Sequence, residues 1–147
     1  MFENHNNSTR MFSLKGLKTK CRFVSIHDGD TITVVIPLFD EYYKFNIRLY
    51  GIDTCEMTLE ETKDLAVKAR NRVFFLATGQ EYTFTSKKQL ENFLDERVYI
   101  LDIECFDFDK YGRVLGKVSI NDIDISQVLI KEKLAYEYNG GKKKTLL

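Results

Sequence analysis

Hydrophobic and polar side chains alternate along the first third of the chain, and this pattern predicts three consecutive strands. The segments CRFVSI (21–26) and TITVVI (31–36) are rich in β-branched and aromatic residues, and the turn sequence HDGD separates them. Gly29 in that turn is available for a positive φ. In the third segment, 42–50, apolar side chains occupy the odd positions from 43 to 49, with polar ones between them. Arg48 is therefore expected to point away from the core side of its strand, beside other polar groups.

Helical spacing replaces this alternation in the middle of the chain. The pattern predicts a helix over 59–78, which begins with a capping box from Thr58 to Glu61 and stops at Gly79. Its apolar positions at helical spacing are Leu65, Ala69, Val73 and Leu76.

The second half of the chain returns to strands. Ser86 and Gln89 can cap a short helix, whose apolar stripe is formed by Leu90, Phe93 and Leu94. Strands at 98–106 and 114–120 flank the polar turn DFDKYGR, and a last helix is predicted over about 125–134.

The order of these elements defines the expected fold. A run of short strands interrupted once by helix is not the alternating pattern of a parallel sheet. Five short strands with a helix between the third and the fourth are typical of an OB-fold. We therefore predict a mainly β (α+β) protein, an OB-fold five-stranded β-barrel with two or three helices. The domain is expected to span 19–140, after a flexible N-terminal arm (1–18) and before a flexible basic tail (141–147).

Composition narrows the class of protein. The chain has 147 residues, enough for one domain, and its 44% hydrophobic and 30% charged residues are typical of a globular protein. Lysine and arginine total 22 and so do aspartate and glutamate, which argues against a tight, non-specific nucleic-acid binder but not against an enzyme that releases its product. No apolar run is long enough for a membrane span or an export signal. The three widely spaced cysteines are expected to be reduced, which agrees with an intracellular protein. We also predict a monomer without membrane contact.

Three polar segments carry the candidate chemistry: DGDT (28–31), RLYGIDTCE (48–56) and DKYGR (109–113). Carboxylates without clustered histidine or cysteine favour a hard cation such as Ca²⁺ or Mg²⁺. Two arginines added to a cation and a carboxylate suit phosphoryl chemistry, because positive groups neutralise charge on the transition state while the carboxylate handles a water. Taken singly, each segment can equally be a polar turn, and Glu56 alone can simply favour a helix N-terminus.

Together, in this order and at these separations, DGDT, R-x-x-x-x-D-T-x-E and D-K-Y-G-R resemble the staphylococcal nuclease-like (thermonuclease) family. The segment LIKEKLAYEYNGGKK also resembles that family's second helix and tyrosine-bearing loop, so the similarity covers roughly residues 20–142. Members of this family are Ca²⁺-dependent nucleases that cut DNA and RNA at the 5′ P–O bond and leave 3′-phosphate ends. The resemblance therefore implies this activity and a nucleic-acid substrate.

The resemblance also implies residue roles. Asp30 and Asp53 would ligate Ca²⁺ through their carboxylates and Thr54 through its backbone carbonyl, with Asp28 behind them. Glu56 would be the general base, and Arg48 and Arg113 would bind the scissile phosphate. The residues implied to contact a neighbouring phosphate or to stack on a base are Lys110, Tyr111 and Tyr138, with Tyr136 as a further candidate.

The chain departs from the family pattern at two places. Cys55 stands where the family commonly has proline, which leaves the loop that carries Glu56 less constrained; Cys55 is either an oxidation point at the site or a small, half-buried thiol. The segment 80–97 is longer than expected and is interpreted as a peripheral insertion. A non-catalytic OB module that binds nucleic acid or protein remains the alternative, although such a copy would be expected to have lost one of the charged site residues.

Overall fold

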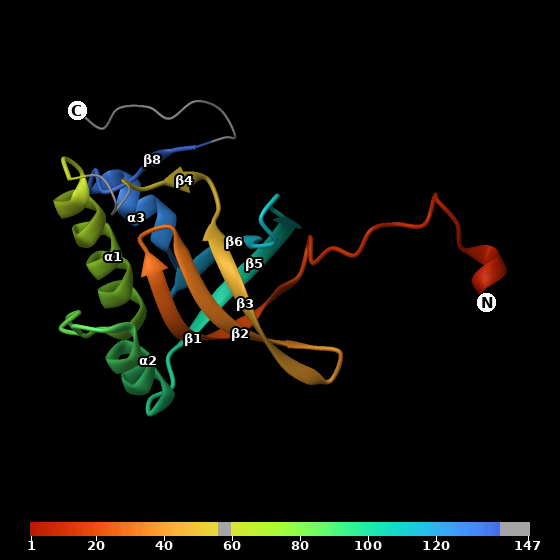
Figure 1. Ribbon diagram of the computed structural model, residues 1–147, viewed down its shortest axis with the longest axis horizontal. Coiled ribbons are helices and arrows are strands. Elements are labelled where there is room, and N and C mark those ends of the chain that lie inside the picture. The colour runs from red at the N-terminus through yellow and green to blue at the C-terminus, as the bar shows by residue number, and fades with distance from the viewer. Residues whose placement is uncertain (56–59, 139–147) are drawn as a thin grey trace.

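Five long strands form a closed barrel in the computed structural model, which describes residues 1–55 and 60–138 (Figure 1). The strands are β1 (Lys18–Asp28), β2 (Thr31–Leu38), β3 (Glu41–Leu49), β5 (Ile100–Phe108) and β6 (Val114–Ile120). Their order is β3-β2-β1-β5-β6, and a parallel pairing of β3 with β6 closes the barrel. With three α-helices around it, this architecture confirms the predicted OB-fold of the α+β class.

Strand β3 follows its predicted alternation only in its second half. Ile47 and Leu49 are buried in the barrel, whereas Tyr43 is exposed and Phe45 is half-buried. The first half of β3 pairs with the end of β2 in a hairpin that projects from the barrel (Figure 1). Because Tyr43 is exposed there, the periodicity marks one face of the strand without marking a core.

Two short ladders were not predicted. Strand β4 (Ile52–Asp53) pairs with β8 (Tyr136–Glu137), and β7 (Ile123–Asp124) returns on β6 through a turn at Asn121 and Asp122. Segments of two residues are too short to show a period of two. The β4–β8 ladder nevertheless matters, because it fixes the tyrosine-bearing segment next to the end of β3.

Helix α1 (Lys63–Thr78) contacts β1 and α3 with a face of small and large apolar residues. Its buried residues are Ala66, Ala69, Val73, Phe74 and Ala77. The predicted start at 59 is wrong, because the helix begins at Lys63 with Thr62 in the N-cap position. The predicted capping residue Thr58 lies outside the described residues. The predicted stop is confirmed, since Gly79 takes the left-handed conformation at φ 74°.

Gly29 does not have the positive φ that the turn sequence predicted. A Cβ atom at this position would lie 2.7 Å from the Cβ of Ala69 on α1 and 3.0 Å from Cγ2 of Thr54. The glycine is therefore required by close packing of the β1–β2 turn against α1 and the chain after β4. This contact holds the turn that carries Asp28 and Asp30 against its neighbours.

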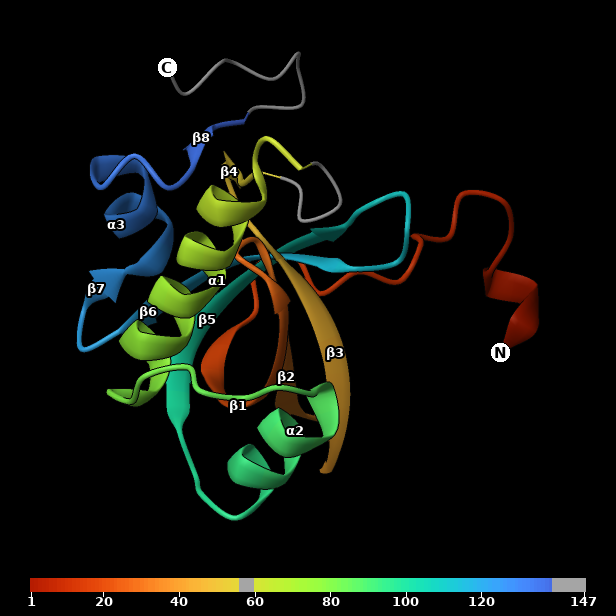
Figure 2. The ribbon, with the colours of Figure 1, turned by 60° about the vertical axis from the view of Figure 1, so that its left-hand side comes forward.

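The interpretation of the segment 80–97 as a peripheral insertion is wrong, because helix α2 (Lys87–Asp95) within it contributes side chains to the core. Ser86 caps it by accepting a hydrogen bond from the Gln89 amide, as predicted, and Leu90 and Leu94 are buried. Nη2 of Arg22 on β1 donates to the carbonyl oxygens at the end of the helix, those of Leu94, Asp95 and Arg97, over 2.9–3.2 Å. In Figures 1 and 2 this helix lies at the end of the barrel opposite β4 and β8.

Helix α3 (Ile125–Lys131) packs on β6 and α1 and is shorter than the predicted 125–134. It stops because Lys133 adopts a positive φ of 61°. At the other end of the chain, a short 3₁₀ helix η1 (Phe2–Asn4) begins a segment that extends away from the barrel (Figure 1) and returns to bury Leu14. The flexible arm and tail remain predictions, and residues 139–147 lie outside the described part.

Two further observations bear on the class of protein. No helix in the described residues is long and apolar enough to cross a membrane. All three cysteines lie in the described part of the chain, and no disulfide joins them. Burial raises the pKa of the Cys105 thiol to about 11, and burial together with the nearby Cys105 raises that of Cys21 to about 12. These two thiols are therefore protonated at neutral pH.

Candidate active site

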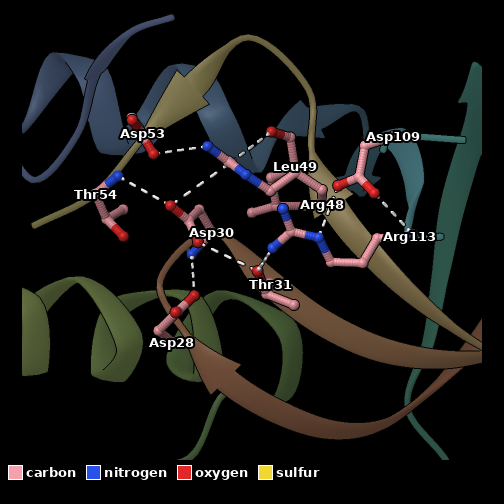
Figure 3. Close-up of polar contacts among 9 residues, drawn as sticks. All are labelled: Asp28, Asp30, Thr31, Arg48, Leu49, Asp53, Thr54, Asp109 and Arg113. Atoms are coloured by element: carbon pink, nitrogen blue, oxygen red, sulfur yellow. Dashed lines mark hydrogen bonds and ion pairs between the residues drawn. The ribbon is translucent and has the colours of Figure 1, made fainter. Parts of the chain in front are cut away.

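The three polar segments of the sequence meet at one end of the barrel. Thr31 begins β2 opposite Arg48 of β3, and Arg48 in turn lies opposite Leu115 in the parallel β3–β6 pairing. Arg113 directly precedes β6, so the closing pair of the barrel brings both predicted phosphate-binding arginines to one side. Figure 3 shows their side chains together with those of the carboxylates.

Arg48 is held between two carboxylates. Its Nη2 atom lies 2.6 Å from Oδ1 of Asp53, and its Nη1 atom lies 3.5 Å from Oδ2 of Asp30 (Figure 3). All three side chains are only 11% exposed. The predicted orientation away from the barrel core is correct, but the side chain is enclosed by polar partners rather than by solvent. Two negative charges thus converge on one guanidinium.

Asp30 is fixed by the backbone around it. The Thr54 amide donates to Oδ2 of Asp30 at 3.1 Å, and the Asp30 amide donates to Oδ1 of Asp28 at 3.1 Å. Burial works against ionisation of Asp30, yet hydrogen bonding with Asp28 and the charge of Arg48 hold its pKa below the usual range. Burial, hydrogen bonding with Asp30 and the charge of Asp30 raise the pKa of Asp28 to about 7. Asp30 is therefore the first of the pair to ionise as the pH rises.

Arg113 is oriented by Asp109 within its own turn. Nε of Arg113 donates to Oδ2 of Asp109 at 2.7 Å, while Oδ1 accepts from the amides of Tyr111 and Arg113. Although burial opposes it, these hydrogen bonds hold the pKa of Asp109 below its ordinary value. Nη1 of Arg113 lies 3.4 Å from Oγ1 of Thr31, which connects this turn to the β1–β2 turn.

A pocket of about 430 Å³ opens between the two arginines. Its wall includes Arg48 and Arg113 together with all three residues predicted to contact substrate, Lys110, Tyr111 and Tyr138. The Tyr138 ring lies 6.0 Å from Cζ of Arg48, and the Tyr138 amide donates to the Gly51 carbonyl at 2.9 Å. Positive groups and aromatic rings thus line one cavity.

The resemblance implies a direct role in metal binding, catalysis or substrate contact for nine residues, and the structure brings eight of them together: Asp30, Arg48, Asp53, Thr54, Lys110, Tyr111, Arg113 and Tyr138. The ninth, Glu56, lies outside the described residues, so its role stays a prediction. Tyr136 lies opposite Asp53 in the β4–β8 ladder and does not line the pocket. Sequence reasoning assigned no role to Asp109, although its spacing of four residues from Arg113 within DKYGR is the signal that could have found it.

The chemistry of the donor set agrees with a hard cation. Within residues 1–55 and 60–138, no group of three or more histidine, cysteine or acidic side chains is arranged to hold a metal. The predicted set needs only two carboxylates, because a backbone carbonyl and water complete it. Asp30 and Asp53 are near one another, buried and ionisable, with Thr54 adjacent to Asp30. These oxygen donors are therefore compatible with a hard cation.

The chain thus has a closed OB barrel with carboxylates and two arginines at one end. The family model described as staphylococcal nuclease homologue matches residues 46–146, more than half of the chain, although its match begins after the DGDT segment. The chain therefore belongs to the staphylococcal nuclease-like family, whose members are generally nuclease hydrolases.

An uncharacterized protein of Bacillus anthracis is also similar to this chain. The two are 32% identical over 119 residues, which cover 80% of this chain and 47% of that relative. The chain thus spans about half the length of the curated relative it matches.

Proposed function

We propose that this protein is a Ca²⁺-dependent, sugar-non-specific nuclease that hydrolyses phosphodiester bonds of DNA and RNA at the 5′ P–O bond to leave 3′-phosphate ends. The observation that carries the proposal is the position of Arg48 and Arg113 on the wall of one pocket, beside the Asp30 and Asp53 carboxylates. Membership of the staphylococcal nuclease-like family supports the same reaction class.

The two arginines bind the scissile phosphate. A guanidinium stays charged at any working pH and offers two parallel donors to phosphate oxygens, which an ammonium group does not. Asp109 fixes the direction of Arg113 through Nε and leaves its Nη atoms for other partners, as the 3.4 Å approach of Nη1 to Thr31 illustrates. The pair thereby stabilises charge on the pentavalent transition state.

Asp30 and Asp53 would hold Ca²⁺ through their carboxylates, with the carbonyl of Thr54 and water. When bound, this ion supplies positive charge against the phosphate oxygens. The low pKa of Asp30 favours this role, because a ligand that is already ionised gives up no proton on binding.

Glu56 accepts the proton of the attacking water as the new P–O bond forms, while the bond from phosphorus to the 5′ oxygen breaks and that oxygen takes up a proton from solvent. A glutamate carboxylate with the reference pKa of about 4.3 is ionised at neutral pH, as a general base must be. Lys110 and Tyr111, on the 109–113 turn, contact a neighbouring phosphate, and Tyr138 stacks on a base. A ring can stack on any base, which agrees with cleavage that is indifferent to sequence.

The direct test incubates the purified chain with plasmid and with denatured DNA, first with Ca²⁺ and then with excess chelator. We expect loss of high-molecular-weight DNA only with free Ca²⁺, and products that a polymerase extends only after phosphatase treatment. Absence of Ca²⁺-dependent cleavage over neutral and alkaline pH contradicts the proposal. DNA binding retained without cleavage would instead support the non-catalytic module.

A further inference from the structure

Tyr50 follows β3 directly and stacks on Phe106 of β5. The ring centroids are 4.3 Å apart and the planes are inclined by 21°. Tyr50 is nonetheless 49% exposed, and it lines the same pocket as Arg48 and Arg113. The pair therefore presents an aromatic surface beside the groups that bind phosphate in the proposed reaction.

The placement of this ring is fixed by the barrel. The Tyr50 amide donates to the carbonyl of Gly116 on β6 at 2.9 Å, and the preceding Leu49 is buried in the core. Phe106 comes from a third strand and covers part of the Tyr50 ring. A side chain held in this way loses little conformational freedom when a ligand stacks on it, so the contact is preorganised.

The surroundings of the ring indicate its ligand. Lys110 and the two arginines provide positive charge along the pocket, and Tyr111 and Tyr138 provide further rings. Positive groups that follow a phosphate backbone, interleaved with aromatic rings, are the arrangement that binds single-stranded nucleic acid. Tyr50 and Tyr138 reach the pocket from different elements. Tyr50 is the first residue after β3, a strand of the barrel, whereas Tyr138 is the first residue after the short strand β8.

We propose that Tyr50, supported by Phe106, is a second base-stacking site, which receives an unpaired base of the strand whose phosphate lies between Arg48 and Arg113. This inference rests on the proposed function and extends it to a substrate class. A base inside a duplex is covered on both faces by its neighbours, so the Tyr50 ring engages only strands whose base is unstacked.

The test compares Tyr50→Leu with wild type in binding a short end-labelled single strand, by fluorescence anisotropy in excess chelator at low salt. Stacking on one base is typically worth about 5- to 150-fold in affinity, and we expect a loss of that size. Tyr50→Phe keeps the ring and should keep wild-type affinity. Tyr43→Leu is the matched control, because Tyr43 is a similarly exposed tyrosine (46%) on β3 and does not line the pocket.

An abasic site moved along the oligonucleotide identifies the base that the ring receives. At one position, removal of the base should weaken wild-type binding but leave Tyr50→Leu binding unchanged, so that the two losses are not additive. Equal dissociation constants for wild type and Tyr50→Leu, including no measurable binding by either, overturn the inference.

Cleavage by wild type in Ca²⁺ is measured in parallel and separates the two proposals. If wild type cuts DNA while Tyr50→Leu binds as wild type does, only the stacking site is rejected. If wild type cuts nothing, the proposed function fails first. A loss of binding by Tyr50→Leu with the circular dichroism spectrum and melting temperature of wild type supports the stacking site.

Discussion

An arginine lies at each end of the barrel, and the two arginines bind different groups. At the α2 end, Arg22 binds three backbone carbonyls at 2.9–3.2 Å. At the candidate active site, Arg48 lies between the carboxylates of Asp30 and Asp53. The packing inside the two ends also differs. At the α2 end, four aromatic rings pack in succession with neighbouring centroids 5.1–6.4 Å apart, those of Phe74, Phe84, Phe93 and Tyr99.

The difference separates a structural role from a chemical one. The carbonyls that Arg22 binds are neutral backbone groups at the end of a helix. Their contact with Arg22 therefore caps the helix and does not prepare a site for a charged ligand. Carboxylates attract a cation and a guanidinium attracts a phosphate, so both sides of the Arg48 cluster can exchange partners. Buried ion pairs also contribute little net stability. In the proposed function, the charged end is therefore the one that binds the cation and the substrate.

The largest expected effect is that of Glu56→Gln. Loss of a general base should lower the cleavage rate about 10²- to 10⁴-fold without weakening DNA binding. Glu91→Gln is the matched control, because Glu91 accepts a hydrogen bond from Ser25 at the α2 end. Initial rates on denatured DNA check both variants. Equal losses for the two would contradict the distinction between the two ends.

Arg48→Lys should lower cleavage about 10²- to 10³-fold, although it keeps the charge. A single ammonium cannot span Asp30 and Asp53 and also pair with phosphate through two donors. The rate and the Kd for oligonucleotide should be measured in Ca²⁺. A rate within a few-fold of wild type would show that the planar guanidinium is dispensable.

Arg22→Gln should act on stability and leave cleavage per folded molecule unchanged. Hydrogen bonds from a charged donor contribute about 1.5–3 kcal/mol, and the substitution removes those that end α2. Urea unfolding, followed by circular dichroism, measures the change in the free energy of unfolding. A fall in activity with unchanged stability would reverse the roles assigned to the two arginines.

Gly29→Ala should lower stability and have an additional, smaller effect on the site. Its Cβ would approach Ala69 to 2.7 Å, and overpacking of this kind costs about 1–3 kcal/mol. Since Gly29 lies between Asp28 and Asp30, the shift should also raise the Ca²⁺ concentration needed for half-maximal activity. Calcium titration of activity and thermal unfolding test the two effects. Gly79→Ala at the end of α1 is a control that should cost stability alone.

The fold could be predicted because alternation and helical spacing identify strands and helices, although in the first half of β3 the alternating apolar side chains are not buried. The turn segments could be identified because carboxylates and arginines at strand ends imply chemistry. What could not be predicted depends on tertiary contacts: Gly29 is constrained by Ala69 of α1, and the β4–β8 ladder has only two residues on each side. The stacking of Tyr50 on Phe106 joins two strands that are distant in sequence, so no local pattern announces it.

The rate of cleavage of a single-stranded oligonucleotide, measured as a function of free Ca²⁺, tests the central claim most directly. If the Asp30–Arg48–Asp53 end of the barrel is the active site of a Ca²⁺-dependent nuclease, the rate should rise from zero and saturate, and Asp30→Asn should shift the curve to higher Ca²⁺. A rate that stays at zero, or one that is independent of Ca²⁺ and persists in chelator, would contradict the account.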